Sequence, residues 1–313
     1  HTTMQISPFA QAVGGTSCLL GLIYWLLTRR KRTSLKGKVV LITGANSGLG
    51  KALAEVFFKA GCKVILAGRN LAQLNDVMEG LKTRHSKSPS DLAILTVDLC
   101  DLQSLEGKGQ EAGAIFGTVD VLINNAGVSY RGNIAETTID VHTKVMNVNY
   151  FGQIALTKAL LPMIKKTNGH IIAISSVQGR ISQAYRSAYA ASKHALQAYF
   201  DCLRAELWST GVHVCVVSPG YIQTDLSLNA VCADGSKYGV MDKTTESGLP
   251  PEQVAKSVLQ AIERGTPEIF PATLTQKTAI VLRAVCPRLL FYIMKKRAKK
   301  QCKEANSRHM KQS

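Results

Sequence analysis

Residues 39–67 follow the order strand, glycine-rich turn, helix and strand, and this unit constrains the fold more than any other stretch. Residues 39–43 (Val-Val-Leu-Ile-Thr) and 63–67 (Lys-Val-Ile-Leu-Ala) are short apolar runs, typical of buried parallel strands. Between them lies the turn G-x-x-x-G-x-G and a helical pattern over 51–60. Such a unit can place a pyrophosphate at a helix N-terminus, although a plain tight turn has the same composition. The turn residues expected to contact a cofactor are Gly44, Asn46, Ser47, Gly48, Leu49 and Gly50.

The rest of the central region continues the alternation of strands and helices. Strands are predicted over 92–97, 119–123, 171–174 and 212–217, and helices over 71–90, 102–116, 140–161, 188–208 and 250–264. This order predicts an α/β fold with a single Rossmann-type, doubly wound parallel sheet flanked by helices. The predicted catalytic domain spans residues 38–275, and two domains are the less favoured division.

The end of the second strand indicates which dinucleotide is bound. A site for NAD would place an acidic residue there to bond the ribose 2′-hydroxyl. This chain has Ala67-Gly-Arg69 and no acid. A guanidinium can pair with a 2′-phosphate, so Arg69 indicates a preference for NADP(H). The less favoured interpretation is that Arg69 is a surface arginine that opens the next helix.

A serine, a tyrosine and a lysine follow the strand at 171–174. Ser176 stands at its carboxyl end, and Tyr189 and Lys193 lie one turn apart on the next helix. An ammonium beside a phenol favours the phenolate, so we expect the pKa of Tyr189 to fall. With Ser176 hydrogen-bonded to a substrate oxygen, the three could move a proton at a carbonyl or alcohol, and a cofactor would have to carry the hydride. The same Tyr-x-x-x-Lys spacing at residue 292 is interpreted as chance.

The net charge of +17 is concentrated at the two ends of the chain. Residues 29–38 contribute six positive charges and residues 277–313 a further ten, so that the body between them is nearly neutral. A nucleic-acid-binding protein would carry its basic residues on the folded body, so this role is excluded. Eight scattered cysteines show no metal-binding spacing, which predicts no metal site and agrees with a reducing compartment.

The N-terminal part predicts a membrane anchor. After a short segment over 1–9, residues 10–28 carry no charge, Tyr24 and Trp25 lie near one end, and a basic linker follows over 29–37. A cleaved signal peptide would carry its basic residues before the apolar part. We therefore expect a single-pass protein of the endoplasmic reticulum membrane, with its catalytic domain in the cytosol.

Several motifs occur together in the order and spacing of a known family. They are Thr43-Gly44-x-x-x-Gly48-x-Gly50, Asp98, Asn124-Asn125-Ala126-Gly127, Asn149, Ser176, Tyr189-x-x-x-Lys193 and Pro219-Gly220. Over roughly residues 37–270 the chain resembles the short-chain dehydrogenase/reductase family.

The resemblance implies roles for the matching residues. Tyr189 would be the general acid/base, Lys193 would lower its pKa and bind the nicotinamide ribose, and Ser176 would orient the substrate oxygen. Asn149 would hold a water that links Lys193 to solvent. The remaining cofactor contacts would be Asp98 with the adenine, Asn125, Ala126 and Gly127 near the ribose, and Ile222 and Thr224 with the carboxamide.

The expected activity is therefore NADP(H)-dependent hydride transfer to or from a lipophilic carbonyl or alcohol. A non-catalytic membrane-bound dinucleotide sensor or scaffold is the alternative from another class, and an NAD-dependent alcohol oxidase is a second. The expected partners are the lipophilic substrate and membrane lipids, with a homodimer as one expected assembly.

Two segments near the C-terminus leave alternatives open. Residues 226–249 are long, polar and glycine-containing, and would form either a mobile lid over the substrate or a disordered surface loop. Residues 276–313 form an amphipathic, basic extension. This extension would lie either in a membrane interface, with its tail on anionic headgroups, or over the domain's own apolar surface.

Overall fold

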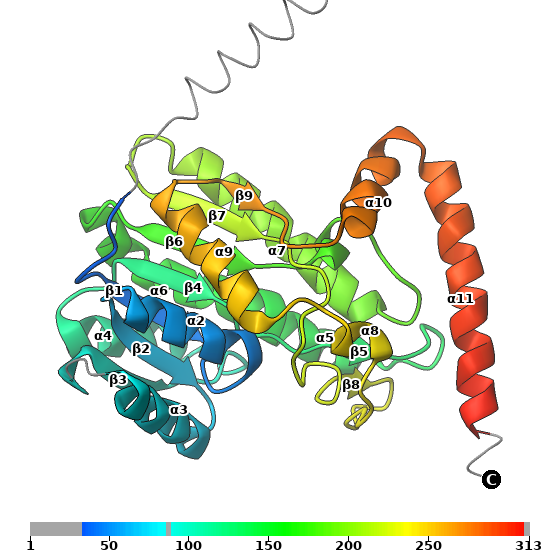
Figure 1. Ribbon diagram of the computed structural model, residues 1–313, viewed down its shortest axis with the longest axis horizontal. Coiled ribbons are helices and arrows are strands. Elements are labelled where there is room, and N and C mark those ends of the chain that lie inside the picture. The colour runs from blue at the N-terminus through cyan, green and yellow to red at the C-terminus, as the bar shows by residue number, and fades with distance from the viewer. Residues whose placement is uncertain (1–32, 86–88, 310–313) are drawn as a thin grey trace, which may run out of the picture.

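The glycine-rich turn joins β1, a strand of a seven-stranded parallel sheet, to the helix that follows it (Figure 1). The computed structural model describes residues 33–85 and 89–309, with side chains as far as residue 302. The strand order is β3-β2-β1-β4-β6-β7-β9. The strands are β1 (Val39–Thr43), β2 (Lys63–Gly68), β3 (Leu92–Thr96), β4 (Val121–Asn124), β6 (His170–Ile174), β7 (His213–Val217) and β9 (Glu268–Ile269). The chain reverses direction across the sheet after β3, so β1 and β4 flank the point where a doubly wound fold binds ligands.

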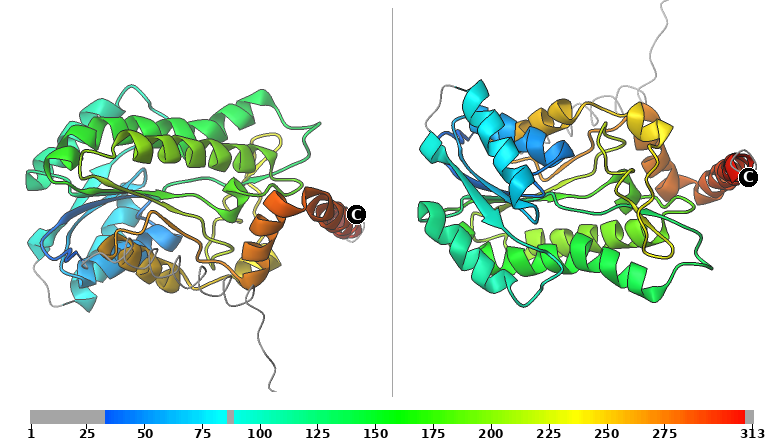
Figure 2. Two further views of the ribbon diagram at one scale, coloured as in Figure 1. Left: turned by 90° about the horizontal axis from the view of Figure 1, so that it is seen from above. Right: turned by 90° about the horizontal axis from the view of Figure 1, so that it is seen from below.

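Helices cover both faces of the sheet, as the two views of Figure 2 show. One face packs against α2 (Gly48–Lys59), α3 (Leu71–Arg84) and α9 (Pro251–Glu263). The other packs against α4 (Leu105–Phe116), α6 (Gly152–Lys166) and α7 (Ser187–Glu206). The shorter α5 (Ile139–Met146) and α8 (Lys243–Glu246) lie towards the C-terminal edge of the strands. α10 (Leu274–Val285) and α11 (Pro287–His309) form a corner at the side of the domain.

The apolar runs of the sequence become strands that are buried on both faces. In β1, Val40 and Ile42 join the core beneath α2 and α9, whereas Val39 and Leu41 join the core beneath α4, α6 and α7. Successive side chains of a strand point to opposite faces, so a strand between two helical layers needs an apolar residue at every position. The predicted α/β sheet is thereby confirmed.

Several elements have no counterpart in the sequence prediction. The helix expected over 140–161 is α5 and α6 joined by a π-helical turn, Asn147–Phe151. Residues 226–249 contain regular structure: β8 (Val231–Cys232) pairs with β5 (Tyr130–Arg131), and α8 follows. Two-residue strands such as β5, β8 and β9 are set by their partners and leave no periodic pattern.

The membrane anchor predicted over residues 10–28 lies outside the described residues. Among the helices that the structure describes, none combines the length and the apolar character needed to cross a bilayer. The described chain begins at Thr33, whose amide donates to the Glu263 carbonyl at the end of α9.

Candidate active site

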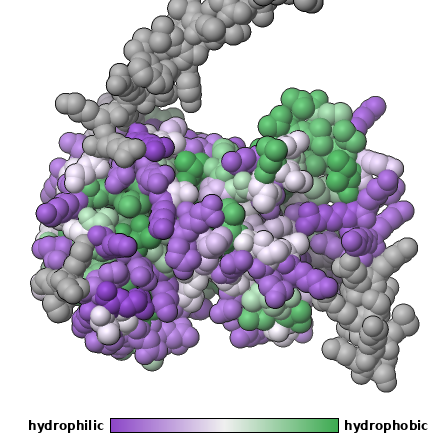
Figure 3. Space-filling model, viewed as in Figure 1, coloured by the Kyte–Doolittle hydropathy of each residue, from purple (hydrophilic) through white to green (hydrophobic). Residues whose placement is uncertain are grey.

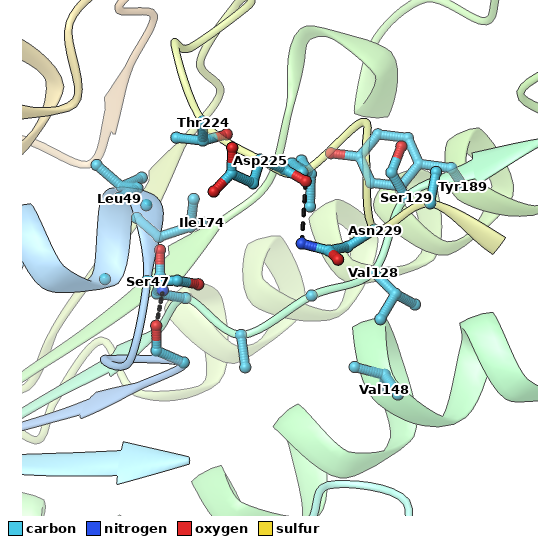
Figure 4. A pocket seen from close by; sticks show the side chains of 18 of the residues that line it. Ser47, Leu49, Val128, Ser129, Val148, Ile174, Tyr189, Thr224, Asp225 and Asn229 are labelled. Carbon is cyan, nitrogen blue, oxygen red and sulfur yellow. Dashed lines mark hydrogen bonds between the residues drawn. The ribbon is translucent and has the colours of Figure 1, made fainter. Parts of the chain in front are cut away.

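A cleft of about 680 Å³ opens at the carboxyl ends of the strands and contains most of the predicted site residues. It runs from the glycine-rich turn after β1, past the ends of β4 and β6, to the segment after β7. Figure 4 shows Ser47 and Leu49 towards one side and Tyr189, Ser129 and Asn229 towards the other. One cleft thus joins a helix N-terminus to a tyrosine that can exchange a proton.

The glycine-rich turn needs its glycines for two physical reasons. Gly44 and Gly48 have φ of 66° and 49°, a region that favours glycine. At Gly50 an added Cβ would lie 2.0 Å from the Gly44 carbonyl oxygen. The side chain of Ser47 does not cap α2. The first amides of the helix therefore remain able to bind an anion in the cleft.

Asn125 holds the ends of β1 and β4 together. Its side-chain amide donates to the Thr43 carbonyl at 2.8 Å, and its backbone N–H and that of Ala126 each donate to the Thr43 hydroxyl at 3.0 Å. The carbonyl of Ala126 in turn accepts from Gln153. These bonds fix the floor of the cleft beside Gly127, so Asn125 positions the backbone that borders the cleft.

Arg69 is exposed at the end of β2, as the sequence predicts. It borders both the main cleft and a second hollow with Asn46, Asn70 and Gln73. Asn46 donates to Gln73 at 2.8 Å, which ties the glycine-rich turn to α3 beside the arginine. The pocket here is polar and cationic. Asp98, which follows the neighbouring strand β3, also lines the cleft and accepts from the Cys100 amide at 2.9 Å.

Ser176, Tyr189 and Lys193 lie together at the end of β6 and on α7. The hydroxyl of Ser176 accepts the Gln178 amide at 3.1 Å and also hydrogen-bonds Tyr189. The ammonium of Lys193 donates to the Ile174 carbonyl at 2.8 Å and lies 5.9 Å from the centre of the Tyr189 ring. The predicted constellation is therefore assembled, with all three side chains almost fully buried.

The sequence predicts a lowered pKa for Tyr189, whereas in the structure this pKa is raised. Burial raises the pKa of this phenol, and the hydrogen bond from Ser176 and the charge of Arg131 only partly oppose the rise. Burial also lowers the pKa of Lys193 to about 7. Removal of both groups from water penalises each charged form, and this penalty outweighs the attraction between the ammonium and the phenolate.

Asn149 lies in the π-helical turn and is fully buried. Its side chain accepts from the Val128 amide at 2.8 Å and donates to the Val128 carbonyl at 2.9 Å and to Ser192 at 3.0 Å. The turn thus aims an amide at the strand end beside Gly127 and at α7. Asn149 therefore links the segment after β4 to α7, the helix that carries Tyr189 and Lys193.

The far wall of the cleft contains residues that sequence reasoning missed. They include Ser129, Arg131, Tyr221 and Asn229. Arg131 donates to Asp242 at 2.6 and 2.9 Å, and Arg186 donates to the same carboxylate oxygen at 3.0 Å. Burial and Arg131 lower the pKa of Arg186 to about 10. This cluster ties the segment 226–249 to β5 and to the start of α7. No local pattern marks it, because its members are far apart in the chain.

The predicted carboxamide contacts are also at the cleft. Ile222 and Thr224 line it after β7, and the methyl of Thr224 would meet a Cβ added at Gly48 at 3.1 Å. Ile222 forms a β-bridge with Leu249, which brings the two ends of the segment 226–249 together. A cleft with an uncapped helix start, a cationic end and a buried Tyr–Lys pair fits the phosphates and ribose hydroxyls of a nicotinamide dinucleotide.

Comparisons with known proteins agree with this geometry. A family model for short chain dehydrogenase matches residues 38–232. The Danio rerio protein named Dehydrogenase/reductase SDR family member 7B is 50% identical over 299 residues, which are 95% of this chain and 96% of that protein.

Solved structures share the fold. A short chain dehydrogenase/reductase from Burkholderia phymatum in complex with NAD has a TM-score of 0.73 at 24% identity, covering 82% of this chain and 96% of that chain. A short chain dehydrogenase from Burkholderia cenocepacia in complex with NADP has a TM-score of 0.69 at 25% identity, covering 84% and 99%. The resemblance inferred from the motifs is confirmed: the chain belongs to the short-chain dehydrogenase/reductase family of oxidoreductases and is similar over almost its whole length to the member 7B proteins.

Proposed function

We propose that this protein is a membrane-anchored, NADP(H)-dependent oxidoreductase that acts on a lipophilic carbonyl or alcohol. The observation that carries the cofactor preference is Arg69, an exposed guanidinium at the end of β2 where an NAD site would have an acid. Its neighbours in the second hollow, Asn46, Asn70 and Gln73, offer polar groups to the same anion. A 2′-phosphate there would gain charge-assisted hydrogen bonds that NAD lacks.

In the reducing direction, NADPH held in the cleft would supply the hydride for the carbonyl carbon of the substrate. Tyr189 gives its hydroxyl proton to the carbonyl oxygen, which becomes the alcohol oxygen. Ser176, already hydrogen-bonded to Tyr189, donates to the same oxygen and holds it in place. The charged form of Lys193 stabilises the phenolate that remains. In the oxidising direction the same phenolate removes the proton of an alcohol.

Two further observations support the lipophilic substrate and the membrane location. Apolar side chains line part of the cleft, among them Val128, Val148 and Leu226. The uncharged stretch over residues 10–28 supports an anchor at a bilayer, where apolar ketones and aldehydes accumulate. An enzyme with both features would draw its substrate from the lipid phase.

The test compares cofactor binding in the full chain, purified in detergent, with two arginine variants. Arg69→Gln should weaken NADPH binding by roughly 10- to 100-fold, the loss of a hydrogen-bonded charge pair, and leave NADH almost unchanged. Arg264→Gln, an exposed arginine at the end of α9, is the matched control and should change neither. Tighter binding of NADH by the unmodified chain would refute the assignment and favour the NAD-dependent oxidase.

Turnover then separates an enzyme from a sensor. NADPH consumption is measured against a panel of lipophilic ketones and aldehydes, with Tyr189→Phe as the inactive reference. Turnover that is lost in the variant supports the reductase. NADPH binding without turnover of any panel member would favour the non-catalytic dinucleotide sensor.

A further inference from the structure

The corner between α10 and α11 exposes an unusual amount of apolar surface. Figure 3 shows it as a hydrophobic cap at the junction of the two helices, above the hydrophilic length of α11. Leu274 is 80% exposed, Val285 72% and Phe291 53%. We call this surface the corner patch; its members are Leu274, Val281, Val285, Leu289, Phe291, Tyr292 and Ile293. Side chains of this kind are usually buried, so the patch indicates a partner.

The spacing of these residues places them on one side of each helix. Leu274, Val281 and Val285 are seven and four residues apart, which places them along one side of α10. Leu289 and Ile293 are one turn apart near the start of α11. The guanidinium of Arg283 lies 4.8 Å from the Phe291 ring centre, which ties one helix to the other. The patch is thus a formed feature of two helices, and none of the α10 residues is buried in the domain.

Charge identifies the kind of partner. Residues 274–300 contain eight lysines and arginines and no acidic residue. Lys296 lies 4.6 Å from the Tyr292 ring centre, so the basic stretch begins where the patch ends. A second copy of this chain would bring the same positive charge to the interface, and so would the chain's own basic segment over 29–38. Apolar side chains bordered by lysines and arginines instead match a bilayer with anionic headgroups.

The two helices are attached to the border of the cleft. Arg297 on α11 donates to the Tyr221 hydroxyl at 3.0 Å, and this hydroxyl donates to Gln183 at 3.0 Å. The side chain of Gln276 on α10 lies against Gly220, where an added Cβ would be 2.1 Å from its oxygen. Tyr221 and Gly220 both line the cleft. A change in the orientation of α10 and α11 would therefore shift Gly220 and Tyr221 at the border of the cleft.

We propose that the corner patch docks on an anionic lipid bilayer and, through Arg297 and Tyr221, holds the border of the cleft at the membrane surface. The apolar members enter the interfacial region while the lysines that follow contact headgroups. This docking does not depend on the cofactor preference. It is also separate from an anchor at residues 10–28, which would tether the chain without orienting the cleft.

The experiment places a single tryptophan in the patch. Phe291→Trp is made in the full chain with Trp25→Phe and Trp208→Phe, and the protein is reconstituted into vesicles of brominated phosphatidylcholine with or without phosphatidylserine. We expect blue-shifted emission from Trp at 291 that the bromolipid quenches, much more strongly with phosphatidylserine present. The matched control carries Ile139→Trp in place of Phe291→Trp, at a 76% exposed position on α5, and should stay unquenched.

A charge variant tests the contact between the lysines and the anionic headgroups. Lys295→Gln with Lys296→Gln should reduce the docked fraction, by roughly fivefold in the docking equilibrium for each lysine removed near an anionic surface. Circular dichroism and NADPH binding confirm that each variant is folded. Absence of quenching in both lipids overturns the proposal, and so does quenching that is indifferent to phosphatidylserine. A blue shift without quenching would mean that protein, such as a second copy, covers the patch, and it also overturns the proposal.

Discussion

The carboxylate of Asp242 should decide how firmly the segment 226–249 closes over the cleft. One of its oxygens accepts from Arg131 at 2.9 and 2.6 Å and from Arg186 at 3.0 Å. The three side chains are only 16%, 9% and 13% exposed. Even with Asp242 in place, burial and Arg131 lower the pKa of Arg186 to about 10. Asp242→Asn removes the single negative charge between two buried guanidiniums and keeps the size of the side chain.

The magnitude follows from that arrangement. Breaking a buried ion pair by removing one partner costs about 3–5 kcal/mol, and the amide oxygen that remains recovers part of it, so about 2–4 kcal/mol is expected. For a domain of this size that lowers Tm by roughly 5–10 °C if the loss is global. If the loss is local, hydrogen exchange in residues 226–249 accelerates instead and KM for the carbonyl substrate rises.

The assay combines thermal unfolding with hydrogen exchange, and Glu246→Gln is the matched control. Glu246 is an exposed acidic residue of the same segment, so its substitution should change neither measurement. Arg186→Gln added to Asp242→Asn should restore part of the loss, because it removes the surplus buried charge. If Asp242→Asn melts like the unmodified protein and exchanges no faster at 226–249, the cluster does not hold the segment and the reasoning is wrong.

Three further predictions concern the cofactor turn, the catalytic pair and the fold. Gly50→Ala should abolish dinucleotide binding in calorimetry while the far-ultraviolet circular dichroism is kept, because its Cβ would meet the Gly44 carbonyl oxygen at 2.0 Å; ordinary binding would contradict this. For reduction, kcat/KM should fall as pH rises through about 7, where free Lys193 loses its proton and no longer stabilises the Tyr189 phenolate; a flat profile up to pH 9 would argue against it. Burial lowers the pKa of His170 from 6.5 to about 4, so protonation favours the unfolded chain and stability present above pH 6.5 is lost towards pH 4. Urea titrations should show about 3 kcal/mol more loss over that range than in His170→Asn, and equal losses would exclude this imidazole as the cause.

The elements that sequence predicted well are those whose burial is uniform. β1 spans Val39–Thr43 as predicted, since a strand between two helical layers is apolar throughout. The placement of Tyr189 and Lys193 on one face of α7 could also be predicted, because residues four positions apart lie one helical turn apart.

What sequence could not predict depends on contacts between distant segments. Arg131 and Asp242 are 111 positions apart, and neither lies in a motif. The π-helical turn at Asn149 is held by bonds to Val128 on another strand end, so the local helical pattern gave no sign of it. The direction of the Tyr189 pKa was wrong because burial of the site is a property of the whole fold.

The shortness of β9 has a consequence for how molecules of this protein meet one another. A sheet edge with free amides and carbonyls can recruit a strand from another chain, and long flat edges aggregate in this way. β9 extends the sheet past β7 with only two residues, Glu268 and Ile269, and the Glu268 carboxylate is engaged by Arg180. The chain then turns away into α10. This border of the sheet therefore offers an intruding strand almost no template, which disfavours edge-to-edge association there.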